Sequence, residues 1–265
     1  MAAPNRSEVS PAMESSGGNP RFRDTTSGHA QPFEIPSLGP PPAPQPTHDT
    51  HPATTQSDRA LAEAAAAVLS CAAGRSRVLV GLTGSPGVGK STFASVLAPR
   101  LADLGRSAVI VPMDGFHLSN AALRRLGRSE RKGAPDTFDV DGFVALLIRA
   151  GEPDAGPVYA PCFHRDLEES IAAEIVIEST HEIVLVDGNY LLLADGAWGL
   201  VRPLLDLCIH LKAGDDAARV ARLVARHVEH GRSPSDAIEW VNRSDEPNAW
   251  LIEAASVRAD RVIRL

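Results

Sequence analysis

The stretch GLTGSPGVGKST at residues 81–92 decides the fold. A short apolar run, SRVLVG, precedes it, and KSTFASVLAPRLADLG follows with apolar residues at helical spacing. A glycine-rich turn of the pattern G-x-x-x-x-G-K-S between a strand and a helix is a phosphate-binding P-loop. Its backbone N–H groups wrap a phosphate, and the helix directs its positive dipole end at the same anion. We therefore predict nucleotide binding by Gly84, Ser85, Pro86, Gly87, Val88, Gly89, Lys90, Ser91 and Thr92.

Two residues of this motif, with one more downstream, predict ATP and Mg²⁺ as cofactors. Lys90 is expected to reach the β- and γ-phosphates, and the Ser91 hydroxyl to ligate Mg²⁺. Asp187 ends the apolar run EIVLVD, as expected of a Walker-B element that holds Mg²⁺ directly or through water. A turn aspartate before Gly188 is the alternative interpretation of Asp187.

Apolar runs typical of buried strands alternate with helical patterns through the rest of the chain. This alternation predicts an α/β fold of three layers, in which helices cover both faces of a mostly parallel sheet. The expected strands are 76–84, 107–114, 174–179, 182–188, 206–213 and 260–265, and the expected helices are 57–74, 90–105, 140–151 and 215–231.

The N-terminal segment has a different composition. Residues 1–56 hold 11 of the chain's 21 prolines and almost no periodic apolar residues, which predicts a disordered tail. A proline-rich docking site and a dispensable extension are the two interpretations of this tail. Ser57 or Asp58 can cap the first helix, so residues 57–265 are predicted to form one P-loop domain.

Composition excludes several functions. A net charge of -7 carries no basic excess, so we expect no nucleic-acid partner. The three cysteines, Cys71, Cys162 and Cys208, form no metal-binding or disulfide pattern and indicate a reducing compartment. There is no apolar run long enough to span a membrane and no signal peptide. We expect a cytoplasmic protein without a membrane partner.

Asp114 is the candidate catalytic base. It ends the strand SAVIVPMD, which we expect beside the P-loop strand, so that its carboxylate faces the γ-phosphate and accepts the proton of an attacking hydroxyl. A carboxylate that caps a turn, or that only holds metal or water, is the alternative.

The predicted helix at 215–231 carries Arg219, Arg222 and Arg226 along one face, with Val220, Leu223 and Val224 on the opposite face. Beside a P-loop, such an array predicts a lid that neutralises the transferring phosphoryl group. Without that context, a solvated stripe is the alternative.

Two basic stretches, at 123–139 and 159–170, lie where loops of an α/β kinase cover its substrate. They supply candidate acceptor-binding residues, to which His117 in MDGFH and Asp114 itself are added. The predicted set is Asp114, His117, Arg131, Lys132, Tyr159, His164 and Arg165. Charged surface loops are common, so each of these contacts has a plain surface residue as its alternative.

The motifs together resemble one family. In order, GLTGSPGVGKST, VPMDGFHLSN, RKGAPDTFDVDGF, VYAPCFHRDLEE, VDGNYLLL, RLVARHVEHGRS and SDEPNA are similar to the phosphoribulokinase/uridine kinase group of P-loop kinases, which includes bacterial-type pantothenate kinase. The likeness runs from about residue 76 to the end and is greatest to the branch of nucleoside/nucleotide or fructose-transport-system kinases. It implies that Lys90 and Ser91 bind ATP and Mg²⁺, that Asp114 is the base, and that Arg222 and Arg226 belong to the lid. Many relatives have Glu where this chain has Asp187, and the shorter side chain favours a contact through water.

We therefore expect an ATP-dependent phosphotransferase that acts on an alcohol group of a nucleoside, sugar or pantothenate-like acceptor. Two alternatives remain open. One is a nucleotide-binding regulatory protein without kinase activity. The other is a GTPase-like switch, since NRSD at 242–245 imitates a guanine-binding motif, although it lacks the Lys and a strand to present it. A homodimer is one oligomeric state that the sequence leaves open.

Overall fold

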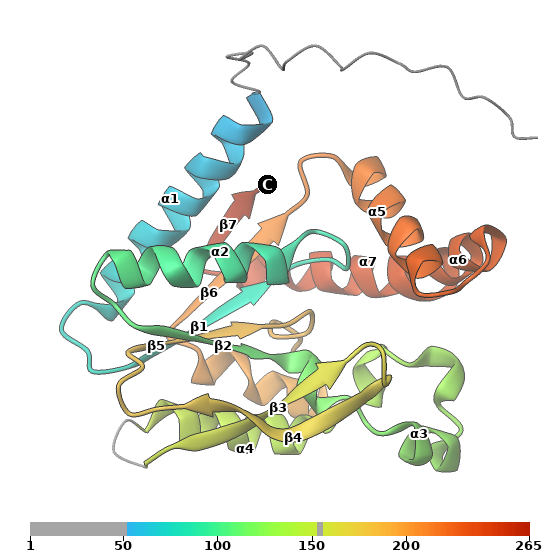
Figure 1. Ribbon diagram of the computed structural model, residues 1–265, viewed down its shortest axis with the longest axis horizontal. Coiled ribbons are helices and arrows are strands. Elements are labelled where there is room, and N and C mark those ends of the chain that lie inside the picture. Colours follow the sequence, from blue (N-terminus) through green and yellow to red (C-terminus); the bar gives the residue numbers. More distant parts are fainter. Residues whose placement is uncertain (1–51, 153–155) are drawn as a thin grey trace, which may run out of the picture. The chain divides into compact units, whose positions relative to one another are not determined.

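The computed structural model describes residues 52–152 and 156–265, so most of the predicted 1–56 tail lies outside the described part. The centre is a five-stranded parallel sheet in the order β2-β5-β1-β6-β7 (Figure 1). Its strands are β1 Val78–Thr83, β2 Ala108–Pro112, β5 Ile183–Asp187, β6 Leu207–Lys212 and β7 Arg261–Arg264. The predicted α/β class with a parallel sheet is confirmed.

Strand order differs from the prediction in one place. β5 lies between β1 and β2, so the strand that leads to Asp114 is not the direct neighbour of the P-loop strand. Consecutive strands are neighbours in only about two-thirds of cases, because pairing is set by long-range packing. Asp187 is in register with Leu82 of β1 and with Pro112 of β2. The Walker-B carboxylate therefore lies between the P-loop and the turn that carries Asp114.

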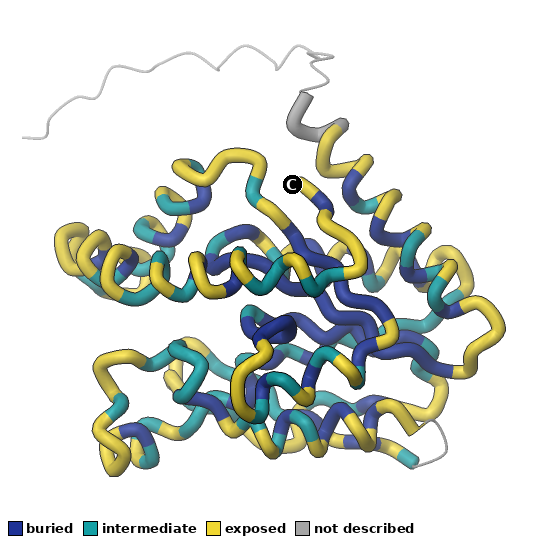
Figure 2. Tube along the Cα trace, turned by 180° about the vertical axis from the view of Figure 1, so that it is seen from behind, coloured by how far each residue is buried: buried dark blue, intermediate teal, exposed yellow. Residues whose placement is uncertain are grey.

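Two layers of helices cover the sheet. Val78, Val80 and Leu82 pack against α1 (Pro52–Ala72) and α2 (Lys90–Asp103), whereas Leu79 belongs to the cluster on the other face. This alternation follows from the two-residue period of a strand. That second face packs against α4 (Val140–Gly151) and Ile252 of α7 (Glu246–Ala255), and Figure 2 shows the buried strands between the layers.

Helix α1 begins at Pro52, upstream of Ser57 and Asp58, so the prediction that one of them caps this helix was wrong. The threonines and glutamine before Ser57 continue the helix instead of ending it. None of the described helices is both long and apolar enough to cross a membrane.

A second, two-stranded sheet replaces one of the predicted loops. β3 (Val158–His164) and β4 (Glu169–Ile177) form an antiparallel hairpin, so most of the 159–170 stretch is strand and turn. The register jumps at Pro161, where three residues of β4 bulge opposite a single residue of β3, and Ala173 there has φ 60°. This irregularity hides the alternation by which a strand is recognised in sequence.

The C-terminal part contains the predicted lid and a continuous helical segment after it. The lid helix is α5, and the segment that follows changes from α to π geometry and back before β7. Bounds of the remaining elements are α3 Asn120–Leu126, α5 Asp216–Glu229, α6 Pro234–Trp240 and the π-helical turn Val241–Asp245. Because 242–245 lie in this helical turn, the NRSD residues have no strand to present them.

Candidate functional site

The P-loop has the backbone of an anion cradle. Gly84, Gly87 and Gly89 have φ values of 154°, 76° and 101°, which a side chain would strain. The Lys90 ammonium donates to the carbonyls of Gly84 at 2.9 Å and Ser85 at 3.3 Å. An ammonium has three donors, so the third is available to a phosphate. The glycines and Lys90 of the P-loop therefore fit the phosphates of a nucleotide.

A pair of hard oxygen ligands lies beside this cradle. The Ser91 hydroxyl donates to the Asp187 carboxylate at 2.6 Å, and Asp187 is only 6% exposed. Burial raises the pKa of Asp187, and Lys90 and Ser91 act against that rise. Burial lowers the pKa of the Lys90 ammonium, which Asp187 and Asp114 partly offset. A hydroxyl and a carboxylate are ligands that Mg²⁺ prefers, so this pair fits that ion.

Asp114 lies in the 3₁₀ turn Met113–Phe116 that follows β2. Its side chain is 41% exposed, and Arg165 Nη2 lies 3.6 Å from its carboxylate. A Cβ on Gly115 would lie 2.3 Å from the Pro161 carbonyl oxygen, so only glycine lets this turn approach β3 so closely. The turn is thereby held against the hairpin.

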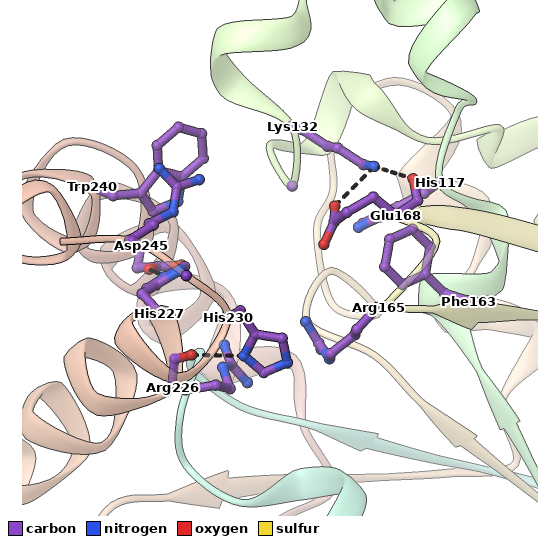
Figure 3. A pocket seen from close by; sticks show the side chains of 13 residues that line it. His117, Lys132, Phe163, Arg165, Glu168, Arg226, His227, His230, Trp240 and Asp245 are labelled. Atoms are coloured by element: carbon purple, nitrogen blue, oxygen red, sulfur yellow. Dashed lines mark hydrogen bonds and ion pairs between the residues drawn. The ribbon is translucent and has the colours of Figure 1, made fainter. Parts of the chain in front are cut away.

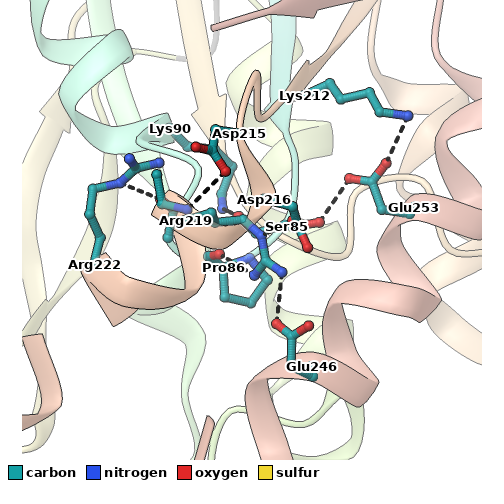
Figure 4. Close-up of polar contacts among 12 residues, drawn as sticks. Ser85, Pro86, Lys90, Lys212, Asp215, Asp216, Arg219, Arg222, Glu246 and Glu253 are labelled. Atoms are coloured by element: carbon teal, nitrogen blue, oxygen red, sulfur yellow. Dashed lines mark hydrogen bonds and ion pairs between the residues drawn. The ribbon is translucent and has the colours of Figure 1, made fainter. Parts of the chain in front are cut away.

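The lid helix α5 is attached to the P-loop through Arg219. This guanidinium is 2% exposed and donates to Asp216 at 2.6 Å, to Glu246 at 2.7 Å and to the Pro86 carbonyl at 3.1 Å (Figure 4). Arg219 is thus not part of a solvated stripe. Glu246 belongs to α7, so this single side chain joins three segments.

Leu223 contacts the P-loop as well. A Cβ on Gly87 would lie 2.6 Å from the Leu223 side chain. The prediction that Leu223 lies opposite the arginines was therefore wrong, because Leu223 is four residues after Arg219 and so lies on the same face of α5. Arg222 donates to the Gly87 carbonyl at 3.3 Å from the same face.

Three cavities meet at Arg226. A cavity of about 240 Å³ is lined by P-loop residues with Arg222 and Arg226. A smaller one of about 70 Å³ is lined by Lys90, Asp114, Asp187 and Arg226 among others. The third, of about 440 Å³, lies between the lid and the hairpin and also reaches Arg226. Burial lowers the pKa of this guanidinium, and nearby Arg165 lowers it further. Such a site favours an anion.

We call the third space the acceptor cavity. Trp240, His227 and Arg226 lie on its lid side, and Lys132, His117 and Phe163 on the opposite side, as Figure 3 shows. Its lining is His117, Lys132, Gly133, Phe163, Arg165, Glu168, Arg226, His227, His230, Gly231, Arg232, Trp240 and Asp245.

Comparison with known proteins finds relatives that this chain matches over most of their length. The chain is 35% identical over 196 residues to "Putative uridine kinase C227.14" of Schizosaccharomyces pombe, covering 71% of this chain and 83% of that protein. The crystal structure of a "putative fructose transport system kinase" from Silicibacter sp. TM1040 is 37% identical, with a TM-score of 0.71 over 76% of this chain and 98% of that one. The chain belongs to the phosphoribulokinase/uridine kinase-like family of P-loop kinases. It is an ATP-dependent kinase of small molecules.

Two other matches were found. "Uncharacterized protein YggC" of Escherichia coli is 32% identical to this kinase over 193 residues, which cover 71% of this chain and 78% of that protein. Residues 49–118 match a family described as the methylmalonyl Co-A mutase-associated GTPase MeaB. That range contains the P-loop and Asp114 but no residue of the lid, the hairpin or the acceptor cavity beyond His117.

The structure brings together part of the predicted acceptor-binding set of this kinase. His117, Lys132 and Arg165 line the acceptor cavity, and Asp114 lines the small cavity beside it. Burial lowers the pKa of His117 to about 4, with Asp114 acting against that shift.

The other three predicted residues lie elsewhere. Arg131 pairs with Asp136 at 2.6 Å, and His164 pairs with Glu174 at 2.6 Å. Tyr159 is 51% exposed on β3. None of these three lines a cavity described above.

Several side chains that shape the site were missed from the sequence. Tyr190 is fully buried and its hydroxyl donates to the Gly133 carbonyl, while Trp198 donates to the Pro135 carbonyl at 3.0 Å. These two rings hold the loop that carries Lys132. Arg232 and Trp240 were also missed from the sequence. The motif HGRS directly after the lid helix contains Arg232 and could have indicated that residue.

Proposed function

We propose that this kinase transfers the γ-phosphate of ATP to a hydroxyl group of a small metabolite in the acceptor cavity, with Asp114 as general base. One observation carries the proposal. Lys90, Ser91, Asp114, Asp187 and Arg226 all line the same small cavity, and Arg226 joins it to the larger cavities on either side. A phosphoryl group passing between nucleotide and acceptor would have to cross this point.

The P-loop side of the proposal assigns the nucleotide. Bound ATP supplies the γ-phosphoryl group, and Mg²⁺ offsets its charge. The P-loop amides and the third donor of Lys90 hold the phosphates. Ser91 and Asp187 hold Mg²⁺, and since Asp187 already accepts from Ser91 at 2.6 Å, we propose that it acts through water.

The adenine ring is proposed to bind in a further cavity of about 470 Å³ next to the phosphates. Gly89, Thr92 and Arg222 line both this cavity and the phosphate cavity. Apolar walls suit an aromatic ring, and here they come from Leu61, Val88, Phe93, Val96 and Leu265.

Asp114 accepts the proton of the acceptor hydroxyl while the hydroxyl oxygen bonds to phosphorus and the bond to the ADP oxygen breaks. Arg226 and Arg222 face the site from the lid, where cations stabilise charge on a transferring phosphoryl group. Arg165 Nη2 lies 3.6 Å from the Asp114 carboxylate and orients it.

His117, Lys132 and Arg165 are proposed to position the acceptor. Contacts from Arg131, Tyr159 and His164 stay predictions of the sequence. The same holds for the tail at 1–56, a cytoplasmic location and a homodimer.

The test is ADP release by the full chain against a panel of nucleosides, pantothenate, sugars and sugar phosphates. One acceptor should raise ADP release well above the background with water, and Asp114→Asn should abolish most of that increment. Acceptor-dependent turnover that survives Asp114→Asn unchanged would refute the assignment of the base.

A further inference from the structure

The acceptor cavity is cationic in an acidic protein. Four of its lining side chains are Lys or Arg and two are carboxylates, whereas the whole chain has a net charge of -7. His117 does not add charge near neutral pH, because burial holds its pKa at about 4. A cavity of this sign concentrates anions.

Most charges in the cavity already have partners. Lys132 pairs with Glu168 at 3.1 Å, and His227 contacts Asp245 at 2.8 Å. Arg165 faces Asp114 at 3.6 Å. The cavity's acidic side chains are thus engaged by other groups.

Arg226 and Arg232 are different, because neither side chain makes an ion pair or a hydrogen bond with any residue in the described part of the chain. Arg226 also lines the cavities beside the P-loop. The Arg232 guanidinium instead stacks on the Trp240 ring, 3.9 Å from the centroid. Stacking fixes the position of a guanidinium without using its five donors. Arg232 is therefore a half-buried, oriented cation with its donors available.

Arg232 is also remote from the nucleotide. It lines the acceptor cavity but none of the cavities formed by P-loop residues, whereas Arg226 and Arg222 each line two of those. The γ-phosphate thus has Arg226 and Arg222, and Arg232 is left for the acceptor.

We infer that the acceptor carries an anionic group, a carboxylate or a phosphate, and that Arg232 binds it at the end of the cavity away from Asp114. The inference rests on the proposed function and narrows its substrate class. Guanidinium binds either anion through two parallel hydrogen bonds, and Lys132 adds charge from the opposite side of the cavity.

A neutral nucleoside fits this cavity poorly. A base would need an aromatic face on which to stack, but the Trp240 and Phe163 rings of the lining already have cations over them. Trp240 has Arg232 at 3.9 Å and Arg243 at 5.3 Å from its centroid, and Phe163 has Lys132 at 5.0 Å. Stacking a base would displace these cation–π contacts, and a neutral base would supply no counter-charge to Arg232.

The first test compares acceptors that differ only in the anionic group. ADP release is measured for glycerate and glycerol, pantothenate and pantothenyl alcohol, and ribose 5-phosphate and ribose, with uridine as the neutral nucleoside. The charged member of a productive pair should have a kcat/KM roughly 10- to 100-fold higher, the range expected for losing a charged hydrogen bond. The pairs also separate carboxylate from phosphate. A neutral member or uridine that wins would overturn the inference and leave the kinase assignment intact.

The second test uses Arg232→Gln, with Arg243→Gln as the matched control on the same indole. Arg232→Gln should raise KM for the charged acceptor roughly 10- to 100-fold, leave KM for ATP unchanged, and lose the preference for charge. Arg243 does not line the cavity, so its variant should behave like the wild type.

A binding measurement keeps the inference testable if no acceptor is turned over. With Mg·ADP saturating the P-loop, calorimetric titration of inorganic phosphate should show binding to the wild type and to Arg243→Gln, and at least roughly 10-fold weaker binding to Arg232→Gln. Equal phosphate binding by all three would refute the anion site whatever the activity. Arg232-dependent phosphate binding without any turnover would support the site and count against the proposed reaction.

Discussion

Replacing Arg219 by Met should loosen the P-loop and destabilise the whole domain. The methionine keeps the buried aliphatic stem but removes three hydrogen bonds, to Asp216, Glu246 and the Pro86 carbonyl. The expected loss of stability therefore comes from missing polar interactions and not from a cavity in the core.

The three partners contribute unequally. Glu246 is 20% exposed, so leaving its carboxylate unpaired costs about 2 kcal/mol, and the bond to Pro86 adds about 1 kcal/mol. Asp216 is 73% exposed and is rehydrated at little cost, as surface pairs are. The free energy of unfolding should fall by about 3 kcal/mol.

Urea unfolding of the full chain at pH 7 measures this change, with Asp216→Asn and Glu246→Leu as matched variants. Asp216→Asn should cost less than about 0.5 kcal/mol. The double variant Arg219→Met/Glu246→Leu should recover about 1–2 kcal/mol relative to Arg219→Met, because no carboxylate is then left unpaired. The reasoning fails if Arg219→Met costs less than about 1 kcal/mol or if the double variant recovers nothing.

Three further outcomes are expected. Asp114→Asn should bind Mg·ATP normally while kcat falls about 10²–10⁴-fold, whereas Lys90→Ala should also lose ATP affinity; single-turnover and equilibrium-binding measurements separate the two, and lost ATP affinity in Asp114→Asn would make it a metal ligand. Arg226→Ala should reduce kcat more than ATP binding, and small equal effects on both would return it to a surface role. His117 titrates near 6.5 when unfolded but at about 4 in the fold, so its contribution to stability is complete above pH 6.5 and is lost as pH falls toward 4; His117→Phe should lose less stability than the wild type between pH 7 and pH 5 in urea unfolding, and equal losses would contradict the assignment.

Local patterns made much of the fold predictable. The P-loop, the strand before it and the helix after it are adjacent in sequence, and α4 was predicted with its observed bounds of Val140–Gly151. The order of β2 and β5 could not be obtained in this way, since strand pairing depends on contacts between distant segments. β3 was missed because Pro161 interrupts it, and only the end of β4 was predicted, at 174–179, because the bulge at 172–174 breaks the alternation of that strand.

The candidate site, like the fold, could be predicted from the sequence only in part. Lys90, Ser91 and Asp187 belong to short motifs whose chemistry is visible in sequence. The acceptor cavity instead combines residues from 117 to 245, and only packing reveals which charges are engaged. Arg131 and Arg232 look alike in sequence, yet the first is paired with Asp136 and the second stacks on Trp240 with its donors available.

The π-helical turn at Val241–Asp245 determines which changes in length this segment of the chain tolerates. A π turn contains one residue more than an α turn, so the loss of one residue would restore regular α geometry and leave Trp240 and α7 in nearly the same relation to each other. A residue gained in regular α geometry would instead rotate Glu246 and Glu253, which hold Arg219 and Ser85, by about 100° relative to Trp240. Single-codon deletions at 241–245 should therefore be tolerated better than single-codon insertions there, and a deep library of both would reveal that asymmetry.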